Sequence, residues 1–240
     1  MSNIVVQNLS IKRGEKQIYE NFSQEFEERK VTVLLAPSGA GKTTLLDFMA
    51  GLVKSQEGQV SGIERISYLF QEPRLLPWYS LEKNVFIPVA EVLDKKEAEE
   101  RCEFFLHEVE LDGRKHALPR NCSGGERQRC ALARAFAYPS SLLLMDEAFQ
   151  SQDILIKLRL MELTEKLLKS EKRTVILVTH DVREALCLGD KILFLSGSPL
   201  SVSYDISCTD KDIPIRERYI SPGKEMLESE SLLLQRFCAL

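Results

Sequence analysis

A short apolar segment followed by a glycine-rich loop constrains the fold of this chain more than any other feature. Residues 31–35 (Val-Thr-Val-Leu-Leu) are nearly all apolar, which is typical of a strand buried on both faces of a parallel sheet. The loop 36–43 (Ala-Pro-Ser-Gly-Ala-Gly-Lys-Thr) follows at once, and a helix is predicted from about Lys42 to Ala50, where Gly51 ends it. We therefore predict an α/β fold built around a parallel sheet.

The order strand, loop, helix is that of a phosphate-binding loop. Backbone N–H groups at the start of the helix point toward the phosphates, and the helix dipole favours negative charge there. Lys42 adds a positive charge for the β and γ phosphates, and Thr43 supplies a hydroxyl for Mg²⁺. The predicted phosphate ligands of this segment are Pro37, Ser38, Gly39, Ala40, Gly41, Lys42, Thr43 and Thr44.

An acidic pair follows a second apolar segment, residues 142–145 (Leu-Leu-Leu-Met). An acid at the carboxyl end of a buried strand can reach the Mg²⁺ shell beside the phosphate loop, and the next carboxylate can orient an attacking water. We assign the first role to Asp146 and the second, that of general base, to Glu147. The alternative is that these two acids have only a structural role at the end of a strand.

A second glycine-rich element, Ser123-Gly124-Gly125-Glu126, begins a predicted helix. Its Ser-x-x-Glu spacing is that of a capping box, and helix capping alone is enough to explain these residues. The two glycines lower helix propensity, yet they let backbone N–H groups approach an anion at the helix N-terminus. Together with the phosphate loop and the acidic pair, this element resembles the ATP-binding subunits of ABC transporters, and the resemblance covers nearly the whole chain.

The resemblance implies a site shared between two subunits. In this family the element 123–126 of one subunit faces the γ-phosphate of the ATP held by the other, and Asp153 matches the aspartate that couples the two. Gln71, at the end of a predicted strand over residues 66–70, matches the glutamine that senses Mg²⁺ and water. His180, after a further buried strand, matches the histidine that contacts the γ-phosphate. The implied cofactors are ATP and Mg²⁺.

Several positions depart from the family pattern. Ala36 replaces a glycine, and its Cβ destabilises the loop if this residue needs a positive φ. Arg13 aligns with the aromatic residue that stacks on adenine; a guanidinium can also stack on a base, or it can be a solvated side chain at a strand end. Together with Gln150 and Gln152, Ala36 leaves a cassette that binds ATP and hydrolyses little as an alternative. Between Glu147 and Asp153 the family usually reads Pro-Phe-Gly-small-Leu, and this chain reads Ala148, Phe149, Gln150, Ser151 and Gln152.

The predicted domain is a P-loop NTPase of RecA-like type. Its core comprises residues 1–71 and 139–240 and includes an antiparallel lobe at the N-terminus, where two partly alternating strands flank Gly14. Residues 72–138 are predicted to form a helical subdomain. Three prolines interrupt it, and two capping boxes mark the starts of helices within it. The prolines are Pro73, Pro77 and Pro88.

Composition limits the partners. The net charge is −4 without a basic run, which argues against nucleic acid as a ligand. No apolar stretch reaches the ~18–20 residues that span a bilayer, and no signal region begins the chain. We therefore expect a peripheral protein on the cytoplasmic face of the cell membrane, bound to a membrane permease. A second copy or a paralogue should complete the ATP site, and a substrate-binding protein should act indirectly.

Residues 71–78 (Gln-Glu-Pro-Arg-Leu-Leu-Pro-Trp) indicate a subfamily. They are similar to the corresponding residues of importers for nitrate, sulfonates, taurine or thiamine-precursor pyrimidines. Trp78 either packs in the core or anchors a helix of the membrane subunit. A soluble ABC ATPase of DNA repair or translation is the alternative, but such proteins usually carry two cassettes or a long coiled coil, and this chain has neither.

The substitution Arg13→Tyr tests the base-binding end of the site. It should tighten ATP binding, because stacking of a base on an aromatic ring is worth about 1–3 kcal/mol in nucleic-acid sites. In the unmodified protein GTP should compete with ATP within about tenfold, or ~1.4 kcal/mol. A competition titration measures both. An unchanged affinity in the variant would mean that the base rests on another residue, with Tyr19 the next candidate.

Overall fold

A six-stranded sheet in the order β5-β6-β7-β3-β8-β9 organises the protein. The computed structural model describes residues 3–150, 153–171, 173–208 and 213–238. The pairs β5–β6, β6–β7, β7–β3 and β3–β8 are parallel, and only β9 joins antiparallel. The strands are β3 (Val31–Leu35), β5 (Ile66–Leu69), β6 (Leu142–Asp146), β7 (Thr174–Thr179), β8 (Lys191–Ser196) and β9 (Ser201–Ser207).

Successive side chains of the central strands enter two different cores. Leu143 and Met145 of β6 pack on one face of the sheet, whereas Leu142 and Leu144 pack on the other. Because every residue of β3, β6 and β7 is buried, these strands read as continuous apolar segments, as predicted. The parallel sheet with helices confirms the α/β prediction.

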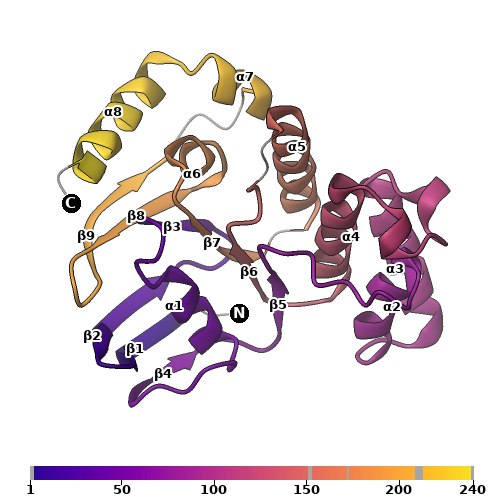
Figure 1. Cartoon of the computed structure of the whole chain (residues 1–240), viewed down its shortest axis with the longest axis horizontal. Coiled ribbons are helices and arrows are strands. Elements are labelled where there is room, and N and C mark those ends of the chain that lie inside the picture. Colours follow the sequence, from indigo (N-terminus) through magenta and orange to yellow (C-terminus); the bar gives the residue numbers. More distant parts are fainter. Residues whose placement is uncertain (1–2, 151–152, 172, 209–212, 239–240) are drawn as a thin grey trace.

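Helices cover one face of this sheet, and α1 and a second sheet cover the other (Figure 1). No helix among the described residues is long and apolar enough to cross a bilayer. The helices on the first face are α5 (Ile154–Ser170), α6 (Val182–Leu188), α7 (Ile215–Ile220) and α8 (Lys224–Cys238). The short helix α7 was not predicted from the sequence.

The second sheet is antiparallel, with β1 (Ile4–Arg13) between β2 (Lys16–Phe26) and β4 (Glu57–Ser61). Gly14 turns the chain from β1 to β2 with a φ of 60°, which suits glycine. β4 was not predicted, because nearly all of its residues are exposed and it therefore lacks an apolar pattern. This sheet packs against α1 (Lys42–Met49) through apolar side chains such as Leu9 and Leu45.

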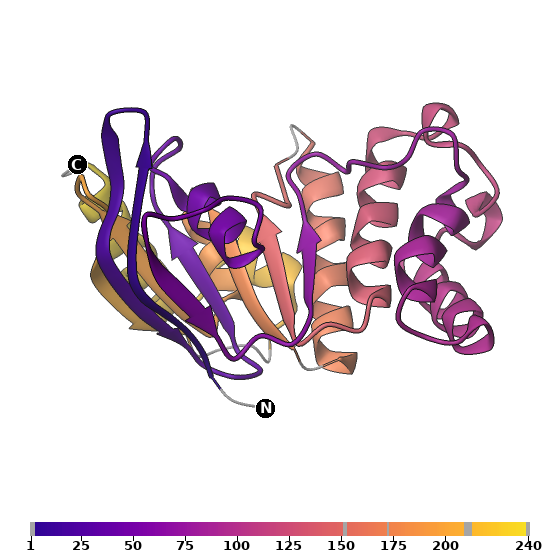
Figure 2. The same cartoon turned by 90° about the horizontal axis from the view of Figure 1, so that it is seen from below.

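Three helices pack together at one end of the molecule (Figure 2). They are α2 (Leu81–Ala90), α3 (Lys95–Glu108) and α4 (Gly124–Ala137), and Phe105 and Phe136 are fully buried among them. Pro88 lies inside α2, so the prediction that it interrupts the segment was wrong; the helix ends two residues later, and only its last turn lacks the proline N–H. The subdomain boundaries at 72 and 138 remain a prediction.

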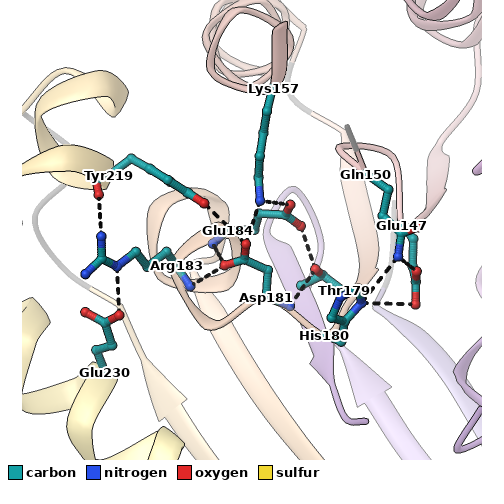
Figure 3. A network of polar contacts seen from close by, with 10 residues as sticks. All are labelled: Glu147, Gln150, Lys157, Thr179, His180, Asp181, Arg183, Glu184, Tyr219 and Glu230. Atoms are coloured by element: carbon teal, nitrogen blue, oxygen red, sulfur yellow. Dashed lines mark hydrogen bonds and ion pairs between the residues drawn. The ribbon is translucent and has the colours of Figure 1, made fainter. Parts of the chain in front are cut away.

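A buried ammonium group joins α5 to the start of α6 (Figure 3). The Lys157 Nζ lies 2.5 Å from Asp181 Oδ2 and 2.7 Å from Glu184 Oε1. Asp181 also caps α6 by accepting hydrogen bonds from backbone N–H groups of that helix. Burial lowers the pKa of Lys157, but the two carboxylates raise it by more, so the net shift is upward and the group stays charged. The network therefore fixes the segment that carries His180.

Removal of this ammonium should destabilise the fold strongly. Lys157→Ala leaves two carboxylates without their partner, Glu184 being almost fully buried, and such losses are worth about 3–5 kcal/mol. Urea unfolding followed by circular dichroism measures the change. Lys169→Ala on the same helix is the matched control: that side chain is 65% exposed and should contribute at most about 1 kcal/mol. Equal losses for the two variants would contradict this account.

Candidate ATP-binding site

The phosphate loop has the backbone that its glycines allow. Gly41 caps α1 with a φ of 119°, and a Cβ at this residue would lie 2.4 Å from the Ile18 side chain. Ala36 is fully buried, and it is not among the residues with positive φ. The expected penalty for alanine at this position therefore does not arise, because the backbone there needs no left-handed conformation.

Lys42 points into its own loop. The Nζ donates hydrogen bonds to the carbonyl oxygens of Ala36 (2.6 Å) and Pro37 (2.9 Å), and it lies 4.0 Å from Glu147 Oε1. The side chain is only 3% exposed. Burial lowers the pKa of this ammonium, and the carboxylates of Glu147 and Asp146 oppose the shift. A positive charge is thus held at the loop by carbonyl groups that a phosphate oxygen can replace.

Thr43 and Asp146 meet across the first turn of α1 and the end of β6. The threonine hydroxyl donates to Asp146 Oδ1 at 3.1 Å. Burial raises the pKa of Asp146, and the hydrogen bond from Thr43 opposes the shift. A hydroxyl and a carboxylate oxygen are the hard ligands that Mg²⁺ prefers, so these two residues fit the ion. Gln71, the third predicted metal ligand, contacts Gln150 instead, with its Nε2 2.7 Å from Gln150 Oε1.

Glu147 has an unusual backbone. Its φ is 45°, a left-handed conformation that glutamate rarely adopts and that is often found at functional sites. Its N–H donates to the Val178 carbonyl at 2.9 Å, which ties the turn to β7. The carboxylate lies 3.5 Å from His180 Nδ1 and accepts a hydrogen bond from Gln150 (Figure 3). The structure therefore brings Glu147 and His180 together, and Gln71 joins them through Gln150.

The element 123–126 forms the full capping box that its sequence predicts. Ser123 Oγ accepts from the Glu126 N–H at 3.1 Å, and a Glu126 carboxylate oxygen accepts from the Ser123 N–H at 2.7 Å. Nothing lies within 4 Å of a Cβ built on Gly124, so the glycine face of the first turn is open. Both views place α4 apart from α1, with β5 and β6 between them (Figures 1 and 2). The chain's own phosphate loop therefore does not face this element.

Asp153 caps α5 and lies beside exposed apolar side chains. Its Oδ1 accepts from the N–H groups of Leu155 (2.8 Å) and Ile156 (3.3 Å). Leu155 is 62% exposed, and Ile154 and Ile156 are exposed as well. Ser151 and Gln152, of which Gln152 departs from the family pattern, lie outside the described residues.

Arg13 ends β1 close to α1, since its Nη2 lies 3.7 Å from Asp47 Oδ2. The guanidinium is 58% exposed, and its stacking on a base stays a prediction. Tyr19 cannot replace it: the ring is fully buried against Phe22, and its hydroxyl donates to the Gly41 carbonyl at 3.2 Å. Trp78 is 68% exposed, so the suggestion that it packs in the core was wrong.

Two contacts were not predicted from the sequence. Gln150 stands out there only as a departure from the family pattern, and no local pattern places its side chain on Glu147 and Gln71. The role of Lys157 was not predicted either, because its position in a helix is that of an ordinary charged residue. A lysine that falls on the apolar face of a predicted helix was the available signal.

Comparison with known proteins agrees with this geometry. Residues 19–150 match the ABC transporter family. The chain is 39% identical over 201 residues to an aliphatic sulfonates import ATP-binding protein of Paraburkholderia xenovorans, covering 84% of this chain and 80% of that protein. It is 40% identical over 194 residues to a protein of the same description from Granulibacter bethesdensis, with 81% and 80% covered.

A solved structure shares the fold. A dimeric ATP-binding cassette in a post-hydrolysis state, bound to ADP and Pi, superposes with a TM-score of 0.74 at 26% identity, covering 86% of this chain and 99% of that one. The family match, the relatives and this structure agree. The chain therefore belongs to the ABC transporter family and is one of its ATP-binding, ATP-hydrolysing proteins.

Proposed function

We propose that the chain is the ATPase subunit of an import system and that two subunits enclose two ATP molecules. The observation that carries the proposal is the separation of two half-sites on one chain. Lys42, Thr43, Asp146 and Glu147 cluster at one edge of the sheet, whereas Gly124 begins α4, which both views place apart from α1 (Figures 1 and 2). Each half-site is incomplete alone, and a second subunit supplies the missing half.

The residues divide the chemistry as follows. Lys42 and the loop N–H groups bind the β and γ phosphates, and Thr43 and Asp146 hold Mg²⁺, which offsets phosphate charge when it is bound. Glu147 accepts a hydrogen bond from the attacking water and orients it, and His180 contacts the γ-phosphate. The partner's element 123–126 presents backbone N–H groups and a helix N-terminus to the same phosphate. Asp153, beside exposed apolar residues, lies at the interface between subunits.

The membrane partner is a permease that contacts residues 75–79. Trp78 and Tyr79 are exposed, with ring centroids 6.4 Å apart, and Trp and Tyr are the residue types that often dominate the binding energy of an interface. The subunit thus works at the cytoplasmic face of the membrane, and a substrate-binding protein delivers the solute. Because the relatives are named for aliphatic sulfonates, we propose a solute of the sulfonate class.

The full set of phosphate, metal and base residues favours an active ATPase over a weakly hydrolysing cassette. Ala36 does not strain the loop, Asp146 accepts a hydrogen bond from Thr43, and Glu147 lies beside His180. A structural ATP-binding role without turnover would not require this set. The departures at Arg13 and Gln150 then change the affinity for ATP and the arrangement of the site before ATP binds, but they do not abolish hydrolysis.

Glu147→Gln should separate ATP binding from hydrolysis. The amide keeps the size of the side chain but cannot act as a base, so turnover should fall by about 10²–10⁴. ATP and Mg²⁺ should then accumulate a dimer, which light scattering detects. Lys42→Ala removes the positive charge that binds the phosphates, so this variant should stay monomeric under the same conditions. Only monomer in the Glu147→Gln sample would argue strongly against the shared site.

A further inference from the structure

We propose that Gln150 is a positioning residue that holds Glu147, Gln71 and His180 in a closed arrangement until ATP binds. The inference rests on the proposed function of these three residues. Its basis is that one amide group contacts all three of them. The family pattern usually has glycine at this position, so the arrangement depends on a side chain that this pattern does not include.

The contacts use the hydrogen-bonding capacity of the amide. Gln150 Oε1 accepts a hydrogen bond from Gln71 Nε2 at 2.7 Å. Gln150 Nε2 donates to Glu147 Oε2 and lies 3.4 Å from His180 Nδ1 (Figure 3). An amide carries two donor hydrogens and one acceptor oxygen, and each of these groups faces one of the three residues.

The local backbone directs the side chain to this place. The Gln150 N–H donates to the Glu147 carbonyl at 3.2 Å, so both residues belong to one turn. The positive φ of Glu147 sets the direction of that turn at the end of β6. Because the Glu147 N–H is bonded to β7, the turn cannot drift away from the segment that carries His180. The turn thus directs the Gln150 side chain toward the ends of β5 and β7, near Gln71 and His180.

These contacts compete with the catalytic arrangement. A carboxylate that orients water must direct an oxygen toward that water, but Glu147 Oε2 accepts from Gln150, and Oε1 faces Lys42 and His180. A glutamine that senses Mg²⁺ must turn its amide toward the ion, but the Gln71 amide is bonded to Gln150. The Lys42 ammonium group likewise donates to carbonyl groups of its own loop instead of to a phosphate. ATP binding therefore has to separate Gln150 from its partners.

The consequence is a lower apparent affinity for nucleotide. When only a fraction of molecules is competent to bind, the apparent dissociation constant rises by the inverse of that fraction. The bond to the Glu147 carboxylate is charge-assisted, and Gln150 is exposed, so a moderate effect is expected. Loss of the contacts should tighten nucleotide binding about three- to tenfold.

The test is a titration of the purified protein with AMP-PNP and Mg²⁺, which avoids turnover. Gln150→Ala and Gln150→Gly should both bind about three- to tenfold more tightly than the unmodified protein. Gln59→Ala is the matched control, because Gln59 is also an exposed glutamine whose amide bonds to a neighbour, Gln7 at 2.9 Å. It should bind as the unmodified protein does.

A double-mutant cycle distinguishes positioning from a general effect on the fold. In a Glu147→Ala background the main partner of Gln150 is absent, so adding Gln150→Ala should change the affinity by less than about twofold. Unchanged or weaker binding by both single Gln150 variants would overturn the inference, as would an undiminished effect in the Glu147→Ala background. Lys42→Ala separates the two hypotheses: if it still binds AMP-PNP normally, the proposed function fails. If it loses binding while the Gln150 variants gain none, only the role of Gln150 fails.

Discussion

The parallel pairing of β3, β6 and β7 is the constraint on which the site depends. Leu35 pairs with Thr179 and Asp146 pairs with Val178, so the three strands end at the same edge of the sheet. The phosphate loop follows β3, the acidic pair ends β6 and His180 follows β7. Groups separated by more than a hundred residues in sequence therefore meet without any long side chain having to bridge them.

Burial on both faces makes this register strict. A shift of one residue would exchange the side chains of two packed cores, each already filled by residues of defined size. The ion pairs of Lys157 add a second fixed point, because they hold α5 against the segment after β7. The two cores and these ion pairs thus fix the ends of the strands that carry the site.

The parts that sequence predicted are those with a strong local pattern. β3 and β6 are continuous apolar segments, and the Ser123 box begins α4 as expected. β4 escaped because its residues are polar and exposed, and its pairing with β1 depends on tertiary contacts. α2 was misjudged because a proline close to the end of a helix removes only one hydrogen bond.

The chemistry of the site was predicted from motifs, but its resting arrangement was not. The spacing of the phosphate loop and the acidic pair indicated the roles of Thr43 and Asp146, and the structure places them 3.1 Å apart. The bonds of Gln150 to Gln71 and Glu147 depend on the left-handed backbone of Glu147, and no residue type in 147–150 predicts that conformation. Likewise, Lys157 gains its role only when two carboxylates from another element pack on it.

The central claim is that each ATP site takes a phosphate loop from one subunit and the element 123–126 from the other. The most direct test mixes two inactive variants, Lys42→Ala and Gly125→Asp. Gly125→Asp should fold, because a Cβ there meets only the Ile156 side chain, at 3.6 Å, while its acid repels phosphate. Each variant alone should hydrolyse almost no ATP.

An equimolar mixture should recover about one quarter of the unmodified turnover, since half of randomly paired dimers are mixed and each mixed dimer holds one intact site of two. ATP hydrolysis measured against the mixing ratio should peak at equal amounts. A mixture as inactive as its two components would contradict the shared site.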